Sequence, residues 1–195
     1  MINKQIFSFI IISVFLILAL GSGDDSDATQ AKKSNQPYLD SMPKTQILFL
    51  DIIEKYDSIY GTSENEIQFQ KICDNKSNEI RSFFKNTNPD SKKVENWYGK
   101  VEELESYALG GGLIVSSESK SGTTFKLTSD EDEAYIRKSS ELYDKISNFK
   151  KGDIVKFTGK FVRSPYNNRY LWSITEYSNS KQEYLFKFES IEVIK

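Results

Sequence analysis

Residues 129–162 read SDEDEAYIRKSSELYDKISNFKKGDIVKFTGKFV and predict an amphipathic helix that leads directly into a β-strand. Apolar side chains recur in this stretch at steps of three and four residues, which places them on one stripe of a helix. The members of the stripe are Ile136, Leu142, Tyr143, Ile146 and Phe149. A helix with one apolar stripe has to bury it, so we expect the rest of the domain to pack against this face.

The sequence also indicates both ends of this helix. Thr128 or Ser129 can cap the first turn, and the acidic residues that follow suit the positive end of the helix dipole. Two lysines precede Gly152, and glycine commonly ends a helix. Residues 153–162 then alternate polar and apolar side chains, which predicts a half-buried strand.

The composition supports a folded core but supplies few catalytic groups. Of the 195 residues, 38% are hydrophobic and 13% aromatic, which is enough for one compact domain. There is no histidine, and Cys73 is the only cysteine, so we expect no disulfide within the chain, no metal site and no cofactor. The net charge of −2 gives no attraction to polyphosphate, which makes nucleic acid an unexpected partner.

Residues 1–21 are expected to be a signal peptide or an N-terminal membrane anchor. Lys4 supplies the positive start, and an apolar run follows at residues 6–20. This run is shorter than the ~20 residues of a membrane-spanning helix, which favours a signal peptide and leaves an anchor as the alternative. The protein is therefore expected to be exported, to the periplasm or another extracytoplasmic site. Residues 22–42 are polar and predict a disordered tether.

Residues 43–88 predict an αα-hairpin. Pro43 suits a first helical turn, and an apolar stripe then continues to Gly61. Ser63 and Glu66 match a capping box for a second helix, which ends before Pro89. Cys73 falls on the apolar stripe of this second helix, so we expect a buried residue rather than a reactive thiol.

Residues 92–195 predict a mainly β domain. Its first strand, residues 94–107, contains Gly99, which permits curvature; glycines 110–112 predict a turn before the strand 113–115. The remaining expected strands are 123–128, 153–162, 170–177 and 184–194. Three meandering strands, a helix and at least two more strands are the order of the OB-fold. The predicted fold class is α+β, an OB-like five-stranded Greek-key barrel preceded by the αα-hairpin.

Four short segments carry a resemblance to a known group of proteins. They are NEIQ (65–68), WYGKV (97–101), GDIVKFTG (152–159) and LFKF (185–188) with Ile191. Together they resemble bacterial exported or membrane-anchored OB-fold proteins of uncharacterised function, in which a helical segment precedes the barrel. The resemblance implies a fold and an exported location, and it implies no ligand.

The best candidate for a ligand-binding surface is the loop that follows residue 162. OB-folds bind ligands through strands two and three and the adjoining loops. The loop interleaves cations with aromatic rings, an arrangement that can stack bases or sugars. Its candidate binding residues are Arg163, Tyr166, Arg169, Tyr170 and Trp172. The alternative interpretation is that these aromatics only cover one end of the barrel.

Catalysis is not expected. Glu102, Glu103 and Glu105 could supply the two carboxylates of a hydrolase, but they alternate between the faces of a strand. The acidic residues 130–133 are explained by the helix dipole. We therefore expect a non-catalytic binding or interaction module of the bacterial cell envelope, with an unknown envelope protein or glycan as its partner. The alternatives are an oligosaccharide- or single-stranded nucleic-acid-binding protein and a carboxylate-dependent hydrolase.

Overall fold

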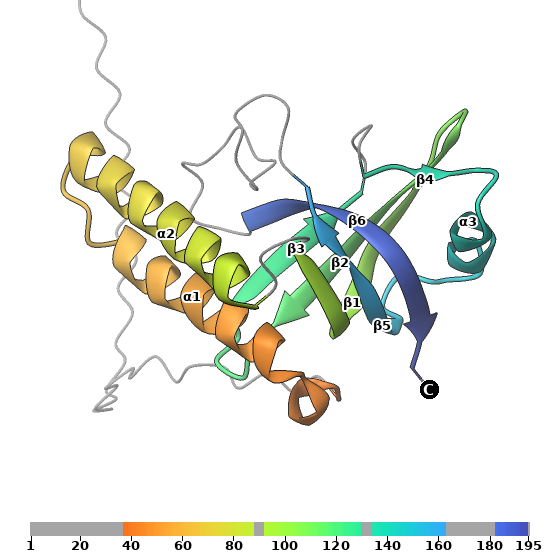
Figure 1. The fold of residues 1–195 in the computed structure, drawn as a ribbon, viewed down its shortest axis with the longest axis horizontal. Helices are drawn as coiled ribbons and strands as arrows, with labels where there is room; N and C mark the ends of the chain where they lie inside the picture. Colours follow the sequence, from red (N-terminus) through yellow and green to blue (C-terminus); the bar gives the residue numbers. More distant parts are fainter. Residues whose placement is uncertain (1–36, 88–91, 130–133, 163–181, 195) are drawn as a thin grey trace, which may run out of the picture. The chain divides into compact units, whose positions relative to one another are not determined.

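The computed structural model describes residues 37–87, 92–129, 134–162 and 182–194, all within one compact unit, Ala31–Lys195. These residues form a mixed α+β fold with one six-stranded sheet and three α-helices (Figure 1). The elements in chain order are η1 (Leu39–Ser41), α1 (Lys44–Tyr60), α2 (Glu66–Thr87), β1 (Lys93–Ser106), β2 (Gly110–Glu118), β3 (Thr124–Thr128), β4 (Ile136–Arg137), α3 (Glu141–Ile146), β5 (Ile154–Phe161) and β6 (Gln182–Val193).

Five of the strands pair in a closed circuit, which we call the ring. The sheet order is β1-β5-β6-β3-β2-β4, and β1 also pairs with β2. All these pairings are antiparallel except β3 with β6, which is parallel. The short strand β4 pairs with the start of β2, outside the circuit.

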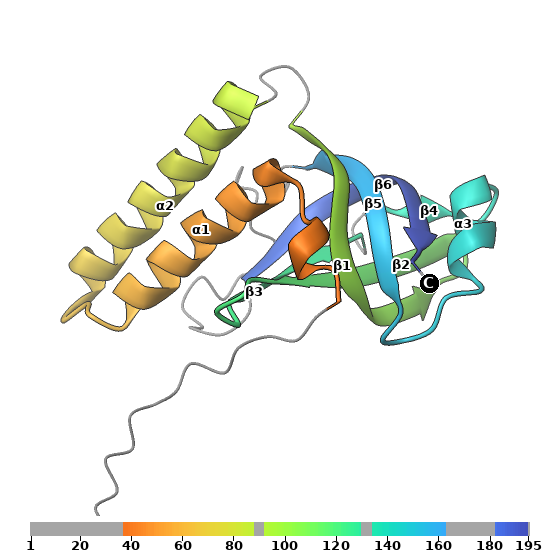
Figure 2. The ribbon, with the colours of Figure 1, turned by 90° about the horizontal axis from the view of Figure 1, so that it is seen from below.

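The long, curved strand β1 closes the ring (Figure 2). Its first half pairs with β5 and its second half with β2, and the pairing register shifts in each half. The two pairings meet near Gly99, where a β-carbon would collide with the side chain of Val115 and the carbonyl of Ser116. Glycine therefore allows β1 to approach β2 at this point.

The αα-hairpin and the ring share one hydrophobic core. Phe49 of α1 is fully buried. Its ring centroid lies 5.1–5.5 Å from aromatic rings on four strands of the circuit: Trp97, Phe125, Phe161 and Tyr184. Helices α1 and α3 lie at opposite ends of the sheet in Figures 1 and 2. Helix α1 thus closes one end of the ring with an aromatic side chain.

A buried glutamine joins α1 to β1. The Gln46 side chain accepts a hydrogen bond from the Tyr98 amide at 2.9 Å and donates to the Tyr98 carbonyl at 2.6 Å. It also donates to Ser117 Oγ of β2 at 2.8 Å. Because β1 pairs with β2 only from Lys100 onward, Gln46 satisfies backbone groups that β2 does not reach.

The helix predicted between Ser129 and Gly152 is wrong at both ends among the described residues, because residues 134–140 and 147–151 lie outside any helix. Helix α3 covers only Glu141–Ile146, and Ile136 lies in β4, paired with Gly111. The capping residue is Ser140, which accepts a hydrogen bond from the Tyr143 amide at 3.2 Å. Ser129 is buried instead, and its hydroxyl accepts from the Leu113 amide at 2.9 Å.

Two other parts of that prediction are confirmed. Ile146 is 4% exposed and belongs to the hydrophobic core. The strand expected at residues 153–162 is present as β5, with buried and half-buried residues alternating along it.

Glycines 110–112 do not form the predicted turn, because they lie within β2. The turn precedes them, and the Tyr107 amide donates to the Gly110 carbonyl at 2.8 Å. A β-carbon on Gly110 would collide with the carbonyl of Ile136 in β4. Close packing between strands, rather than a flexible turn, therefore requires glycine here.

Helices α1 and α2 lie where the sequence predicts a hairpin, but the second helix is capped differently. Asn65, not Ser63, accepts a hydrogen bond from the Gln68 amide at 3.0 Å. The Gln68 side chain in turn accepts from the Glu64 amide at 2.9 Å. The segment NEIQ is therefore the start of α2, with asparagine rather than serine as its cap.

The prediction of a tether is wrong for residues 37–42, which belong to the fold. Tyr38 is 3% exposed, and its ring stacks on that of Tyr98 at 6.3 Å between centroids. The turn of η1 follows directly. Burial of its aromatic ring holds Tyr38 against the sheet. The tether up to residue 36, the segment 1–21 and the strand predicted at 170–177 lie outside the described residues.

Candidate functional site

The binding residues predicted from the sequence cannot be placed. Arg163, Tyr166, Arg169, Tyr170 and Trp172 lie outside the described residues. The structure describes the strands on either side of this segment, β5 and β6, and the Val162 amide donates to the Leu185 carbonyl at 3.0 Å. The proposed stacking surface therefore stays a prediction.

The carboxylates that could supply a hydrolase, Glu102, Glu103 and Glu105, differ in their partners and exposure. Glu102 accepts a hydrogen bond from Ser116 Oγ at 2.6 Å and lies 3.1 Å from the ammonium of Lys100. Partial burial opposes its ionisation, but the hydrogen bonds from Ser116 and Lys100 prevail and lower the pKa of Glu102. Glu105 accepts a hydrogen bond from the hydroxyl of Tyr107, and Glu103 is exposed. Each carboxylate thus has a separate environment.

Metal ligands are not gathered in the described part of the chain. No group of three or more His, Cys, Asp and Glu side chains there could hold an ion. Residues 130–133 lie outside that part. Cys73 is a buried residue of α2, as the sequence predicts.

A buried lysine lies between the two helices of the hairpin. The Lys76 ammonium is 3.9 Å from a carboxylate oxygen of Asp57 and 5.3 Å from the centroid of the Tyr60 ring. Burial lowers the pKa of Lys76 from its ordinary 10.5 to about 8, against the attraction of Asp57. Burial likewise raises the pKa of Asp57. Since Lys76 is 1% exposed, its ammonium group is enclosed in the core rather than available to a substrate.

The free energy of unfolding should therefore rise with pH between about 8 and 10.5. In this window the unfolded chain binds a proton at residue 76 that the folded chain has released, so deprotonation favours folding. The contribution has an upper limit of about 3 kcal/mol. Urea unfolding across this range should show the slope in the wild type and in the exposed control Lys55→Met, and lose it in Lys76→Met. A slope that persists in Lys76→Met would assign it to another group.

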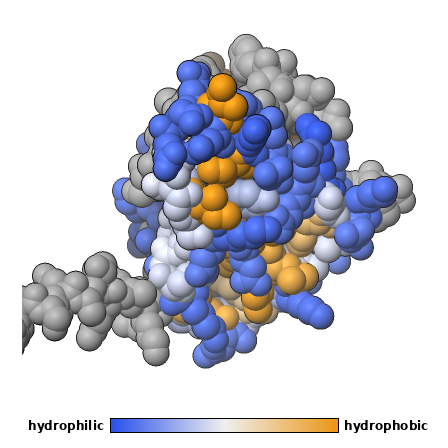
Figure 3. Space-filling model, turned by 90° about the vertical axis from the view of Figure 1, so that its left-hand side faces the viewer, coloured by the Kyte–Doolittle hydropathy of each residue, from blue (hydrophilic) through white to orange (hydrophobic). Residues whose placement is uncertain are grey.

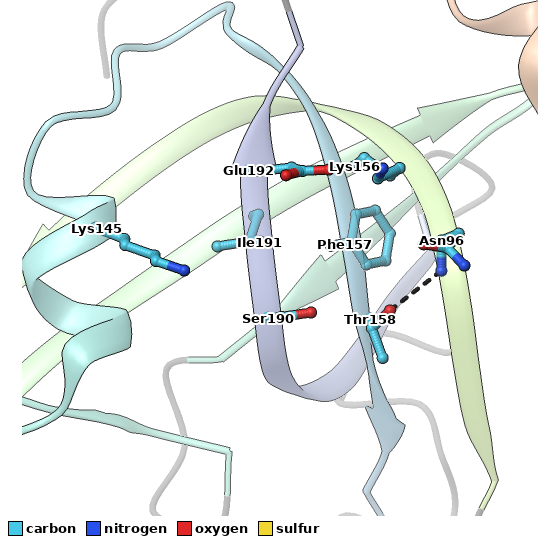
Figure 4. Close-up of a pocket in the computed structure, with 8 residues that line it drawn as sticks. All are labelled: Asn96, Lys145, Lys156, Phe157, Thr158, Ser190, Ile191 and Glu192. Carbon is cyan, nitrogen blue, oxygen red and sulfur yellow. Dashed lines mark hydrogen bonds and ion pairs between the residues drawn. The ribbon is translucent and has the colours of Figure 1, made fainter.

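A small polar hollow lies between α3 and the strands β5 and β6 (Figure 4). Its volume is about 170 Å³, and its lining residues are Asn96, Lys145, Lys156, Phe157, Thr158, Ser190, Ile191 and Glu192. Some of its polar groups already bond to one another: Lys156 pairs with Glu192 at 2.6 Å, and the Asn96 amide donates to Thr158 Oγ1 at 3.2 Å. Ligand pockets usually have volumes of roughly 300–1,000 Å³, so this hollow is small for a ligand.

A larger groove lies between η1, the start of α1 and the turn that joins β2 to β3. Its volume is about 400 Å³. Its lining residues are Leu39, Asp40, Met42, Ile47, Leu50, Asp51, Glu54, Ser119, Lys120 and Ser121. This volume falls within the range of ligand pockets. By volume, the groove is therefore the better candidate for ligand binding of the two.

Acidic groups predominate around the groove. The Lys120 ammonium lies 2.7 Å from Asp40, and this hydrogen bond lowers the pKa of the Asp40 carboxyl. Asp51 and Glu54 have no ion-pair partner within residues 37–87, 92–129, 134–162 and 182–194. Two carboxylates of the groove are therefore available to a cationic ligand.

Sequence reasoning missed the groove because its walls are distant in the chain. One wall comes from residues 39–54 and the other from residues 119–121. On α1 the structure leaves two apolar side chains near the groove partly exposed, Ile47 at 44% and Leu48 at 42%. Figure 3 shows apolar side chains in patches among hydrophilic ones on the side where α1 and α2 are joined.

Comparison of the chain with protein-family models and with curated proteins finds no match. Among the helices within the described ranges, none combines the length and apolar character needed to span a membrane.

Proposed function

We propose that this chain is an exported, non-catalytic interaction module of the bacterial cell envelope, built on an OB-like five-stranded Greek-key barrel. The closed strand circuit supports the barrel, as do the parallel pairing of β3 with β6 and the helix between β3 and β5. The resemblance of four sequence segments to exported OB-fold proteins supports the same assignment.

The main support for the proposal is that side chains fill the interior of the ring. Phe49 packs between aromatic side chains at the α1 end, and fully buried Leu113, Val115 and Leu127 add to the core. At the other end α3 contributes the buried Ile146. Since the core occupies this space, ligands would bind to the outer surface, as in many proteins that act by association.

Export is supported by the sequence of the N-terminal segment. Residues 1–21 combine a lysine with an apolar run, in the pattern of a signal peptide or an anchor at 6–20. A polar segment of the chain, with few bulky apolar residues, separates this run from Tyr38. The module would then be positioned outside the cytoplasm, where an envelope protein is the expected partner.

Site-specific photocrosslinking in intact cells tests the proposal. A photoreactive amino acid is placed in turn at four exposed apolar positions: Ile47, Ile67, Leu109 and Val193. We expect a discrete adduct, recovered with the envelope fraction, from at least one position, with Glu141 on α3 as a polar comparison. Absence of adducts at all four positions, with the protein folded and present at normal levels, would contradict the interaction module.

A further inference from the structure

The groove beside η1 has the features of a docking site for a particular kind of peptide. We propose that it binds a short segment of a partner protein that carries both apolar side chains and lysine or arginine. This inference rests on the proposed function, since it names the chemistry of the partner that the module would bind.

The apolar residues of the groove indicate apolar side chains on the partner. Leu39, Met42, Ile47 and Leu50 contribute to its lining. Leu50 is only 2% exposed, whereas Ile47 is 44% exposed and presents apolar surface to water. Covering that surface with an apolar side chain is favourable. The volume of about 400 Å³ suits a few such side chains rather than a whole folded domain.

The charges of the groove indicate cations on the same segment. Asp51 and Glu54 have no ion-pair partner among the described residues, and Asp40 already holds Lys120. Charge complementarity favours lysine or arginine beside the carboxylates and disfavours an acidic peptide. The same carboxylates would repel an anionic membrane surface or a nucleic acid, which makes a protein segment the better-matched occupant.

A peptide-binding measurement with the full chain tests the assignment. The probe is a fluorescent eight-residue peptide that alternates leucine with lysine. Two matched peptides serve as controls. One alternates leucine with glutamate, and the other alternates serine with lysine. We expect the leucine–lysine peptide to bind about tenfold more tightly than either, because each matched peptide lacks one of the two complementary features. Equal binding of the three peptides would overturn the proposal.

Matched variants locate the binding site. Asp51→Asn combined with Glu54→Gln should weaken the leucine–lysine peptide about threefold to tenfold, as expected for the loss of two exposed ion pairs, and should reduce its salt dependence. Ile47→Ser should weaken it similarly. Ile67→Ser on α2 and Glu141→Gln on α3 are the controls and should not change binding. All five altered positions are partly or fully exposed, and thermal melts verify folding. If the groove variants bound the leucine–lysine peptide as tightly as the wild type, the peptide would not bind in the groove, which would contradict the proposal.

Two further outcomes would assign the groove to another occupant. If Lys32→Ser with Lys33→Ser raised the affinity for the peptide several-fold, the chain's own N-terminal segment would fill the groove. If sedimentation showed a dimer that Ile47→Ser dissociates, a second copy would fill it. Either result would overturn the proposal that a segment of a partner protein occupies the groove. The photocrosslinking experiment distinguishes this failure from that of the proposed function, since adducts at Ile67, Leu109 or Val193 would preserve an interaction module without this groove.

Discussion

Replacing Phe49 by alanine should lower the free energy of unfolding by about 3–5 kcal/mol, the usual cost of removing a fully buried phenylalanine. Phe49 belongs to α1, yet it contacts aromatic rings from four strands of the ring. The cavity left by its removal would open in the shared core rather than at the surface of the hairpin. Urea denaturation followed by circular dichroism measures the change, against a typical total stability of about 5–15 kcal/mol.

Leu48→Ala is the matched control for this experiment. Leu48 precedes Phe49 in the same helix but is 42% exposed. Its replacement should change stability little, within the range of about 0.5 kcal/mol typical of surface substitutions. Equal effects of the two substitutions would show that α1 does not close the ring with Phe49.

The substitution Ile146→Asp should unfold the domain or come close to it. Ile146 is 4% exposed and is the one buried residue of α3. A carboxylate at this position would be buried without a cation or hydrogen-bond donor placed to pair with it, at a cost of several kcal/mol. Thermal melting should show a large loss of stability for Ile146→Asp.

Glu141→Ala is the control on the same helix, because Glu141 is exposed. Its melting temperature should stay near that of the wild type. If Ile146→Asp also melted near the wild-type temperature, α3 would be a peripheral helix that contributes nothing to the core.

The sequence predicts the parts of this fold that depend on local patterns. The stripe of α1, the alternation of β5 and the burial of Ile146 all follow from periodicity along the chain. The error at residues 134–140 has a non-local cause. Ile136 fits the helical spacing, but its backbone pairs with Gly111, a contact that no pattern within the segment encodes.

The capping residues show the same limit at shorter range. Both Ser63 and Asn65 can cap a helix, and both precede a suitable side chain. The hydroxyl of Ser63 instead donates to the Tyr60 carbonyl at 3.0 Å, at the end of α1. Because Ser63 is used in the tight connection between the helices, Asn65 caps α2. This connection depends on the hairpin as a whole and not on the local sequence around Ser63 or Asn65.

The groove was beyond sequence reasoning for a geometric reason. Its apolar residues lie on η1 and α1, and its serines and Lys120 lie on the turn after β2. Only the packing of α1 onto the ring, through Phe49 and Gln46, brings these segments together. Any function assigned to the groove therefore depends on α1 being a permanent part of the fold.

Amide hydrogen exchange on the folded full chain tests most directly whether α1 is a permanent part of the fold. If α1 is an integral part of the fold, the amides of Phe49 and Ile53 should exchange with the same free energy of opening as those of Val155 and Phe157 in β5, and that value should equal the global stability. If α1 exchanges at a much lower free energy while β5 stays protected, the hairpin opens separately. The end of the ring would then be exposed, which contradicts a closed core with recognition at the outer surface.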